Sequence, residues 1–321
     1  MPTNLPNPRL TPRFAGLMTF GRYPRLADSP APDWSIFGAP FDSGVTYRPG
    51  ARFGPRAIRE ASQYLKPYHL EHAIDVCQLL TLADAGDSPV LPYGLEENAR
   101  TVTAFANALP KSSKLFALGG DHSIAYANIR ATFERNRSPK GGLAVIHFDS
   151  HLDTVDKVWD NSWGHASPFR RAIDDGLIDP KAMLSIGIKG PLNTGSDLDY
   201  ARDQGITIVT YERWARGDGK QAIQKFVDNL ESRPAYVTFD IDAIDPAFAP
   251  GTGTLSVGGF TSAEALHLLR SLKHSRNGKP VNVIGGDVVE VLPDRDPSGI
   301  TAMLAAHIAF EILALDALGR V

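Results

Sequence analysis

Short apolar runs alternate with longer amphipathic stretches along most of this 321-residue chain. The runs are too short for core helices, and they lack strict alternation of polar and apolar positions. Both properties favour strands that are covered on both faces of a sheet. The pattern predicts seven strands, at residues 35–38, 115–119, 143–148, 183–188, 206–210, 235–240 and 281–287.

Helical periodicity fills the intervals, at residues 51–64, 94–108, 220–232, 261–272 and 301–318. In the last of these, Leu304, Ile308, Ile312 and Leu315 form one apolar stripe. Strands and helices in alternation predict an α/β fold, with a doubly wound, mostly parallel sheet flanked by helices. Because no internal repeat or linker interrupts the pattern, we expect a single domain over residues 31–321.

Residues 1–30 precede this domain as a proline-punctuated arm. Its apolar patch at residues 14–18 could pack on its own domain or on a neighbouring subunit. The first twelve residues contain four prolines and no apolar core of a signal peptide, so we expect neither a leader nor a membrane span there.

Charge and cysteine content narrow the functional class. Lys and Arg number 33 against 36 Asp and Glu, which gives a net charge of −3 without a strong block of either sign. This argues against nucleic acid and membrane surfaces as partners. Cys77 is the one cysteine, which excludes an intramolecular disulfide and a cysteine-based zinc site. We expect it to be buried, and a cytoplasmic location fits this cysteine usage.

Polar clusters follow three of the predicted strands, where ligands bind in this architecture. His122 lies in the sequence GGDHS and would begin the next helix, although an isolated histidine there is more often structural. Asp240 and Asp242 lie in TFDIDAIDP and share a face of the chain. Alternatively, one of the two aspartates caps a helix.

The third cluster, HFDSHLD, places Asp149, His151 and Asp153 at a spacing of two. In an extended chain the outer pair would stand about 13 Å apart. Two metal ions in one site are only roughly 3.5–4 Å apart, so the segment must curl as it leaves the strand. A solvated polar strand end is the weaker alternative, because two aspartates beside a histidine would repel one another without a cation.

The clusters together supply four carboxylates and two imidazoles: His122, Asp149, His151, Asp153, Asp240 and Asp242. With neutral histidines, four negative charges balance two divalent ions, and one bridging hydroxide would leave the centre at −1. Such a centre would attract a cationic substrate. Oxygen-rich mixed ligation suits Mn²⁺, and imidazole also admits Ni²⁺, Co²⁺ or Zn²⁺. A two-metal cluster can supply hydroxide near neutral pH.

These motifs, with GAPFD at residues 38–42 and GVTYRPGARFGPRAIREAS at 44–62, resemble the arginase/agmatinase (ureohydrolase) family over almost the whole chain. The similarity is strongest to its agmatinase and guanidinobutyrase branch. It implies an arginase-like three-layer fold and hydrolysis of a guanidino compound, such as agmatine, guanidinobutyrate or a related small guanidine, to urea and an amine. It also implies a homo-oligomer, a trimer or a hexamer.

The resemblance further implies a role for each residue. His122, Asp149, Asp153 and Asp240 would bind one ion, and Asp149, His151, Asp240 and Asp242 the other. Asp153 would also orient the hydroxide and pass its proton on. His165, in GHASPF, would carry a proton to the leaving amine, and Glu290, in DVVEV, would pair with the substrate guanidinium.

Three positions depart from the family pattern. Ser150 stands where alanine is usual, Leu255-Ser256 where Pro-Glu is usual, and residues 294–296 read DRD where PYD is commoner. Trp159 and Trp163 lie in the loop expected to contact the substrate tail. They could form an apolar wall or a cation–π surface, or only pack the loop.

The sequence is compatible with three kinds of substrate tail. Arg48 and Arg295 are candidates to bind a carboxylate, Asp42 and Asp160 to bind a distal amine, and a small guanidine would need neither. Alternatives are a hydrolase of the same fold that acts on free guanidine or formiminoglutamate, and a weakly active subunit of a hetero-oligomer.

Overall fold

An eight-stranded parallel sheet forms the centre of the computed structural model, which describes residues 2–136 and 141–321. The strand order is β4-β1-β5-β10-β9-β6-β7-β8, and every neighbouring pair in it is parallel. This confirms the predicted doubly wound sheet. The strands are β1 (Trp34–Ala39), β4 (Leu82–Asp87), β5 (Lys114–Gly119), β6 (Leu143–Phe148), β7 (Ile178–Ile188), β8 (Thr207–Thr210), β9 (Ala235–Asp240) and β10 (Val283–Val289).

All seven predicted strands are present, with two informative differences. Strand β10 runs two residues beyond its predicted end, so Glu290 comes directly after a fully buried strand. Strand β4 was not predicted, because it forms one edge of the sheet and only its first half is buried. A short antiparallel hairpin, β2 (Tyr68–His69) with β3 (Ile74–Asp75), was also missed.

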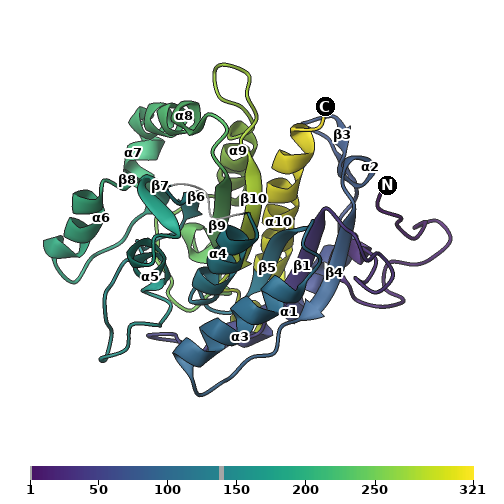
Figure 1. The fold of residues 1–321 in the computed structure, drawn as a ribbon, viewed down its shortest axis with the longest axis horizontal. Helices are drawn as coiled ribbons and strands as arrows, with labels where there is room; N and C mark the ends of the chain where they lie inside the picture. Colours follow the sequence, from purple (N-terminus) through teal and green to yellow (C-terminus); the bar gives the residue numbers. More distant parts are fainter. Residues whose placement is uncertain (1, 137–140) are drawn as a thin grey trace.

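Helices cover both faces of the sheet (Figure 1). Helices α1, α9 and α10 pack together on one face, and α3, α4 and α5 pack together on the other. The helices are α1 (Gly54–Ala61), α2 (Val76–Leu79), α3 (Leu95–Ala108), α4 (Ile124–Arg135), α5 (Pro168–Asp174), α6 (Asp199–Gln204), α7 (Tyr211–Ala215), α8 (Asp218–Leu230), α9 (Ser262–Ser271) and α10 (Ile300–Leu318). Single 3₁₀ turns are η1 (Phe20–Arg22), η2 (Ala51–Phe53), η3 (Ser62–Tyr64), η4 (Gly195–Leu198), η5 (Ile241–Ala243) and η6 (Pro293–Arg295).

Helix α10 is buried on more sides than one apolar stripe would require. Phe310 and Leu313, outside the predicted stripe, are buried as well as Ile308 and Ile312. The helix is long and apolar enough to cross a membrane by composition alone, but 78% of that window is buried inside the fold. A helix that is apolar on all sides is typical of a core helix, and α10 packs between β10, α1 and α9.

The N-terminal segment is attached to the body at both ends. The Thr3 hydroxyl donates to the carbonyl of Leu80 at 2.6 Å, and Phe20 is fully buried. Between them, Phe14 and Leu17 are 90% and 68% exposed, so the apolar patch does not pack on its own chain. Residue 1 lies outside the described part of the arm. Cys77 is buried, as predicted.

Candidate metal centre

The predicted ligands gather at the carboxyl ends of neighbouring strands. His122 follows β5, Asp149 follows β6, and Asp240 is the last residue of β9. Strand β10, which precedes Glu290, lies between β5 and β9 in the sheet. Parallel strands present these ends at one edge, so residues far apart in the sequence meet there. Helix α4 begins at Ile124, two residues later than predicted, and His122 lies in the turn before it.

Three carboxylates surround His122. Its Nδ1 lies 3.1 Å from Asp149 Oδ2, 2.9 Å from Asp153 Oδ2 and 3.3 Å from Asp240 Oδ2. The predicted curl brings Asp153 there, and this residue has a positive φ of 52°. None of these contacts is a hydrogen bond, so Nδ1 is buried without a hydrogen-bond partner. A nitrogen facing three carboxylate oxygens in this way fits a cation between them.

Two further ligands meet on the other side of Asp149. Nδ1 of His151 lies 3.3 Å from Asp149 Oδ1 and 3.1 Å from Asp242 Oδ2. Asp149 therefore directs one oxygen towards each histidine, which is the geometry of a bridging carboxylate. The donor set fits two cations, with Asp149 shared between them.

The buried carboxylates of this centre also need positive charge close to them. Burial raises the pKa of Asp240 well above its ordinary value, and the charges of Asp242 and Asp149 raise it further. Burial would do the same to Asp149, but the adjacent imidazoles of His122, His147 and His151 hold its pKa well below the usual range. Carboxylates crowded in a buried place are costly unless positive charge is paired with them.

The orientation of His122 is fixed by Thr238 and Asp287, which lie outside the predicted set of ligands. Thr238 Oγ1 donates to Asp287 Oδ1 at 2.6 Å and therefore accepts from His122 Nε2, which is 2.9 Å away. Nε2 then carries the ring proton, and Nδ1 is free to bind a metal. Tyr236 donates to the other oxygen of Asp287 at 2.6 Å. The one available signal was the position of Thr238, two residues before Asp240 on the same face of β9.

His147 orients the carboxylate of Asp149. Its Nε2 lies 2.9 Å from Asp149 Oδ2 and its Nδ1 lies 3.1 Å from Ser185 Oγ. His147 stands within the HFDSHLD motif, but its spacing of two from Asp149 did not distinguish a ligand from a supporting residue.

Glu290 and His165 form a second polar group beside the ligands. Glu290 is buried and has a φ of 65°. Its Oε1 accepts from the backbone N–H of His122 at 2.8 Å and lies 2.8 Å from Nδ1 of His165. Its Oε2 is buried without a partner. An anionic oxygen left free in this way can accept a cationic group of a ligand.

His165 is held on both of its ring nitrogens. The backbone N–H of Thr46 donates to Nε2 at 2.9 Å, so the neutral ring carries its proton on Nδ1, towards Glu290. Burial lowers the pKa of His165, but the charge and hydrogen bond of Glu290 outweigh it and raise the pKa to about 9. A protonated ring can instead donate from Nε2 to Thr46 Oγ1, which is 2.7 Å away.

Asp121 connects this group to the loop after β1. Its Oδ2 accepts from the backbone N–H of Gly44 at 2.8 Å, and the carbonyl of Gly44 accepts from the backbone N–H of His165 at 2.9 Å. Burial and the charge of Glu290 raise the pKa of Asp121 to about 7. Asp121 belongs to the GGDHS motif, and nothing in that motif indicates this role.

The residues that could bind the substrate tail differ in whether they already have partners in the fold. Asp42 is buried, accepts from the backbone N–H of Gly50 at 2.6 Å and pairs with Arg52, so its suggested role as partner of a distal amine is wrong. Arg48 stacks on the ring of Tyr47, 4.9 Å from its centroid. Within the described residues, no carboxylate lies within 4 Å of the Arg48 guanidinium. Arg295 is exposed on η6.

The two loop tryptophans behave differently. Trp163 packs edge-on against Tyr126, with ring centroids 5.0 Å apart, as the packing alternative predicted. Trp159 is 79% exposed at the tip of a two-residue turn, where both it and Asp160 have positive φ, 50° and 59°. Non-glycine residues rarely adopt this conformation, so the turn is strained.

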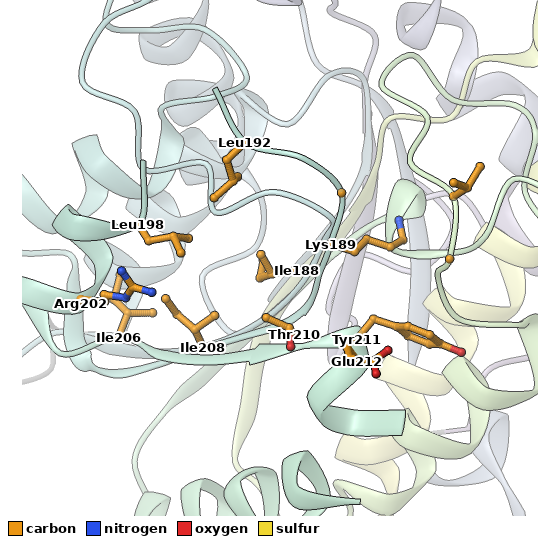
Figure 2. Close-up of a pocket in the computed structure, with 13 residues that line it drawn as sticks. Ile188, Lys189, Leu192, Leu198, Arg202, Ile206, Ile208, Thr210, Tyr211 and Glu212 are labelled. Atoms are coloured by element: carbon orange, nitrogen blue, oxygen red, sulfur yellow. The ribbon is translucent and has the colours of Figure 1, made fainter. Parts of the chain in front are cut away.

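A cavity of about 710 Å³ lies beside β7 and β8 (Figure 2). Its floor is apolar, from Ile188, Leu198 and Ile208, with Arg202 at the rim. Lys189 lines it as well, and its ammonium donates to the backbone carbonyl of Asp242 at 2.7 Å. Lys189 therefore connects the lining of this cavity with the main chain of Asp242.

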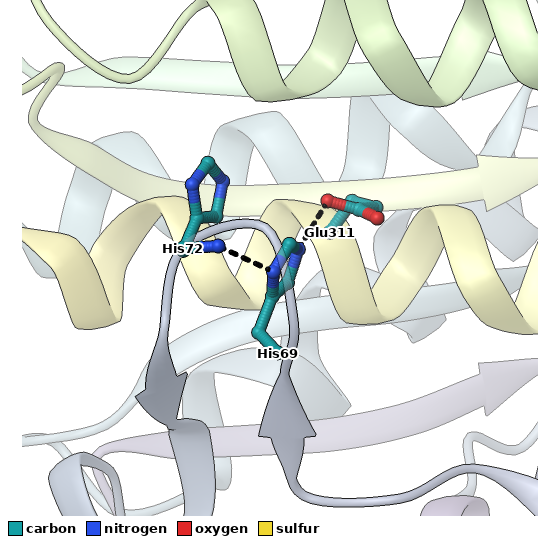
Figure 3. A group of neighbouring side chains, drawn as sticks. All are labelled: His69, His72 and Glu311. Carbon is teal, nitrogen blue, oxygen red and sulfur yellow. Dashed lines mark hydrogen bonds and ion pairs between the residues drawn. The ribbon is translucent and has the colours of Figure 1, made fainter.

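A separate histidine pair lies between the β2–β3 hairpin and α10. His69 contacts Glu311 at 2.8 Å and stacks on His72, with ring centroids 4.2 Å apart and planes 22° apart (Figure 3). A metal lies in the plane of each imidazole that binds it, so two stacked rings cannot share one ion in this arrangement. Arg270 already pairs with Glu311. This group is a hydrogen-bonded part of the core.

Comparison with known proteins gives one consistent result. The chain matches the arginase family over residues 32–315. It is 38% identical over 306 residues to a guanidinopropionase of Pseudomonas aeruginosa, covering 95% of this chain and 93% of that protein. It is 40% identical over 305 residues to a proclavaminate amidinohydrolase of Streptomyces clavuligerus, covering 95% and 94%. A solved structure of the Streptomyces clavuligerus enzyme superposes with a TM-score of 0.87, covering 96% of this chain and 100% of that one.

Proposed function

This chain belongs to the arginase family, and on that premise we propose that it is a metal-dependent hydrolase that cleaves a guanidino compound to urea and an amine. The observation that carries the proposal is the free oxygen of Glu290. It is a buried carboxylate oxygen without a partner, on the same side chain that holds the backbone of His122. A planar guanidinium is the cation that such an oxygen binds best, through charge-assisted hydrogen bonds.

Six side chains would hold two divalent ions. His122, Asp149, Asp153 and Asp240 would bind one, and Asp149, His151, Asp240 and Asp242 the other. Bound ions of this kind supply a nucleophilic hydroxide at neutral pH. The predominance of carboxylate oxygens favours Mn²⁺, with Ni²⁺ as the second candidate.

The chain's own groups would place the substrate and move the protons. Glu290 would fix the guanidinium with its carbon towards the ions. Asp153, which contacts His122 and is 9% exposed, would accept a proton as the nucleophile forms. The contact with Glu290 raises the pKa of His165 to about 9 and so favours a protonated ring, which would donate its proton to the departing nitrogen.

We further propose that the tail of the substrate carries a carboxylate. Of the two candidate amine partners, Asp42 pairs with Arg52 and Asp160 lies exposed in the turn beside Trp159. Arg48, in contrast, has no acidic partner in the described chain and stacks on Tyr47. Thr46, two residues before Arg48, contacts His165. On the other side, a Cβ added to Gly253 would lie 2.9 Å from the Arg48 carbonyl. The relatives include enzymes named guanidinopropionase and guanidinobutyrase.

A substrate panel tests both parts of the proposal. Urea release would be measured with Mn²⁺-loaded and Ni²⁺-loaded protein on 3-guanidinopropionate, 4-guanidinobutyrate, agmatine, arginine and free guanidine, and glutamate release on formiminoglutamate. We expect the guanidino acids to give the highest kcat/KM. Urea from none of the guanidines, with metal bound, would refute the activity.

The role of Arg48 has its own test. Arg48→Met should raise KM for guanidino acids at least tenfold and leave KM for free guanidine unchanged, because free guanidine has no carboxylate to lose. Arg216→Met, which removes an arginine from an exposed surface ion pair with Glu212, serves as the control and should change neither. Equal effects on both substrates would contradict the assignment.

We also propose an oligomeric state and a cellular location for this protein. The exposed side chains of Phe14 and Leu17 support a homo-oligomer, a trimer or a hexamer, in which they are covered. A lone buried cysteine is consistent with a reducing compartment, and we propose the cytoplasm. Sedimentation of the intact protein would determine the oligomer.

A further inference from the structure

Lys189 follows β7 and reaches behind one of the metal ligands. Its ammonium lies 2.7 Å from the backbone carbonyl of Asp242 and also contacts the hydroxyl of Ser150. That hydroxyl donates to the same carbonyl at 2.8 Å, and the backbone N–H of Ser150 donates to Asp242 Oδ1 at 3.0 Å. Lys189 and Ser150 together hold both the main chain and the carboxylate of Asp242.

The fold leaves a path for the lysine side chain. A Cβ on Gly259 would collide with Cε of Lys189 and lie 2.7 Å from the carbonyl of Ala243. The backbone N–H of Lys189 donates to the carbonyl of Ser150 at 3.1 Å, so the two residues are tied by main chain as well. Both ends of the lysine are therefore fixed to the segment that follows β6.

The two sides of the metal centre differ in what holds them. On one side, His122 is buried and fixed through Thr238. On the other, the side chain of His151 is 44% exposed, and within the described residues no hydrogen bond to its ring nitrogens is found beyond its contacts with Asp149 and Asp242. The ligands that contact His151 on this second side are Asp149, which His147 orients, and Asp242.

Asp242 is held in place by hydrogen bonds from Thr254, Lys189 and Ser150. Thr254 Oγ1 donates to its Oδ2 at 3.0 Å, the oxygen that faces His151. Lys189 and Ser150 fix its main chain. Serine stands at position 150 where the resembled family usually has alanine, so this chain has an additional hydroxyl at the point of contact.

We propose that Lys189, with Ser150, is a positioning residue that sets the affinity of the ion bound by His151 and Asp242. This rests on the proposed function. Within the described residues no carboxylate lies within 4 Å of the Lys189 ammonium, so it acts by holding the backbone and not by forming an ion pair. Its charge alone would repel a cation. Geometric positioning therefore predicts weaker metal binding when the lysine is removed, whereas simple repulsion predicts tighter binding.

Metal titration distinguishes geometric positioning by Lys189 from simple charge repulsion. The full-length protein would be titrated with Mn²⁺ alone, following the free ion by electron paramagnetic resonance and the bound ion by elemental analysis. We expect two ions per wild-type chain. Lys189→Met, which keeps a long unbranched side chain, should retain one ion with wild-type affinity and bind the other about tenfold more weakly, the loss typical of a removed supporting contact. Lys189→Arg, which keeps a donor, should lose less.

Two further variants complete the test. In a His151→Asn background the affected ion is already lost, so adding Lys189→Met should change the remaining affinity by less than about twofold. Ser150→Ala removes one of the two hydrogen bonds to the Asp242 carbonyl and should weaken the same ion by about threefold. Thermal unfolding of the metal-free proteins checks that each variant is folded.

Several results would overturn the inference. These are unchanged or tighter binding of both ions in Lys189→Met, equal weakening of both ions, or an unchanged Ser150→Ala. A wild-type chain that binds no Mn²⁺ would instead overturn the proposed function, and this inference with it. Two bound ions without hydrolysis of any guanidino compound would reject the activity alone.

Discussion

Nδ1 of His165 lies 2.8 Å from Oε1 of Glu290, while Oε2 of the same carboxylate is buried without a partner. One side chain therefore supports the proton on a histidine and leaves an anionic oxygen for a cationic ligand. Glu290 also accepts from the backbone of His122, so this carboxylate is fixed relative to the metal ligands. In the proposed mechanism, substrate placement and proton supply would therefore both depend on Glu290.

Removal of the charge on Glu290 should abolish most of the activity without removing the metals. Glu290→Gln keeps the shape of the side chain but loses its charge-assisted contact with a guanidinium, so kcat/KM should fall by about 100-fold to 1,000-fold. Urea release and metal content would be measured on the same sample. Glu212→Gln, at a surface ion pair with Arg216, is the control. A variant with near-normal kcat/KM would contradict the role.

The His165–Glu290 contact should make stability depend on pH. The pKa of His165 is raised from 6.5 to about 9 in the folded chain, so the contact stabilises fully below pH 6.5 and is lost as the pH rises through about 9. The full contribution is on the order of 3 kcal/mol. Denaturant unfolding of the metal-free protein from pH 6 to 10 should show this loss.

The comparison for that experiment is His165→Asn, in which the pH-dependent part should be missing. Other titrating groups are common to both proteins, so the difference between the two curves isolates His165. If the two free energies of unfolding run parallel between pH 6.5 and 9, Glu290 does not raise the pKa of His165 in the folded protein.

The number of bound ions should depend on which aspartate is replaced. Asp149 faces both His122 and His151, so Asp149→Asn should lose both ions. Asp153→Asn should lose only the ion beside His122, and Asp242→Asn only the ion beside His151, because each contacts one histidine. Elemental analysis after desalting gives the count.

A surface aspartate provides the control for that series. Asp199→Asn, at a loose exposed pair with Arg202, should keep both ions. Two ions retained by Asp149→Asn would show that this carboxylate does not bridge.

Loss of the support behind His122 should weaken the ion on its side. Thr238→Val removes the hydroxyl between His122 Nε2 and Asp287, so the ring loses the partner that fixes its proton. We expect that ion to bind 10-fold to 100-fold more weakly, by about the magnitude known for such supporting contacts. Thr207→Val on the edge strand β8 is the matched control. Unchanged affinity in Thr238→Val would mean that the hydroxyl does not orient the ring.

Much of the fold could be predicted from the sequence, because its signals are local. Buried parallel strands are short apolar runs, and all seven predicted runs form strands of the sheet. Strand β4 was missed because it lies at the edge and is only half buried, so half of its residues are not apolar. The stripe read on α10 was too narrow, because periodicity cannot show how many neighbours surround a helix.

The candidate metal-binding side chains could also be predicted from the sequence. A spacing of two places Asp240 and Asp242 on one face, and the fold class puts strand ends together at one edge of the sheet. The need for a curl at Asp153 followed from the length of an extended chain. Its positive φ shows how the curl is made.

The partners of these side chains were decided only by the tertiary structure. By residue type, Asp42 could have bound an amine of the substrate, but its carboxylate already pairs with Arg52. Thr238, Asp287 and Lys189 carry no motif that marks them as supports, because their roles depend on contacts between strands that are distant in the chain. The sequence by itself determined which side chains could bind metal and at which edge of the sheet. Which nitrogen faces the metals, which carboxylates stay free and what holds Asp242 depend on packing in three dimensions, which local spacing does not encode.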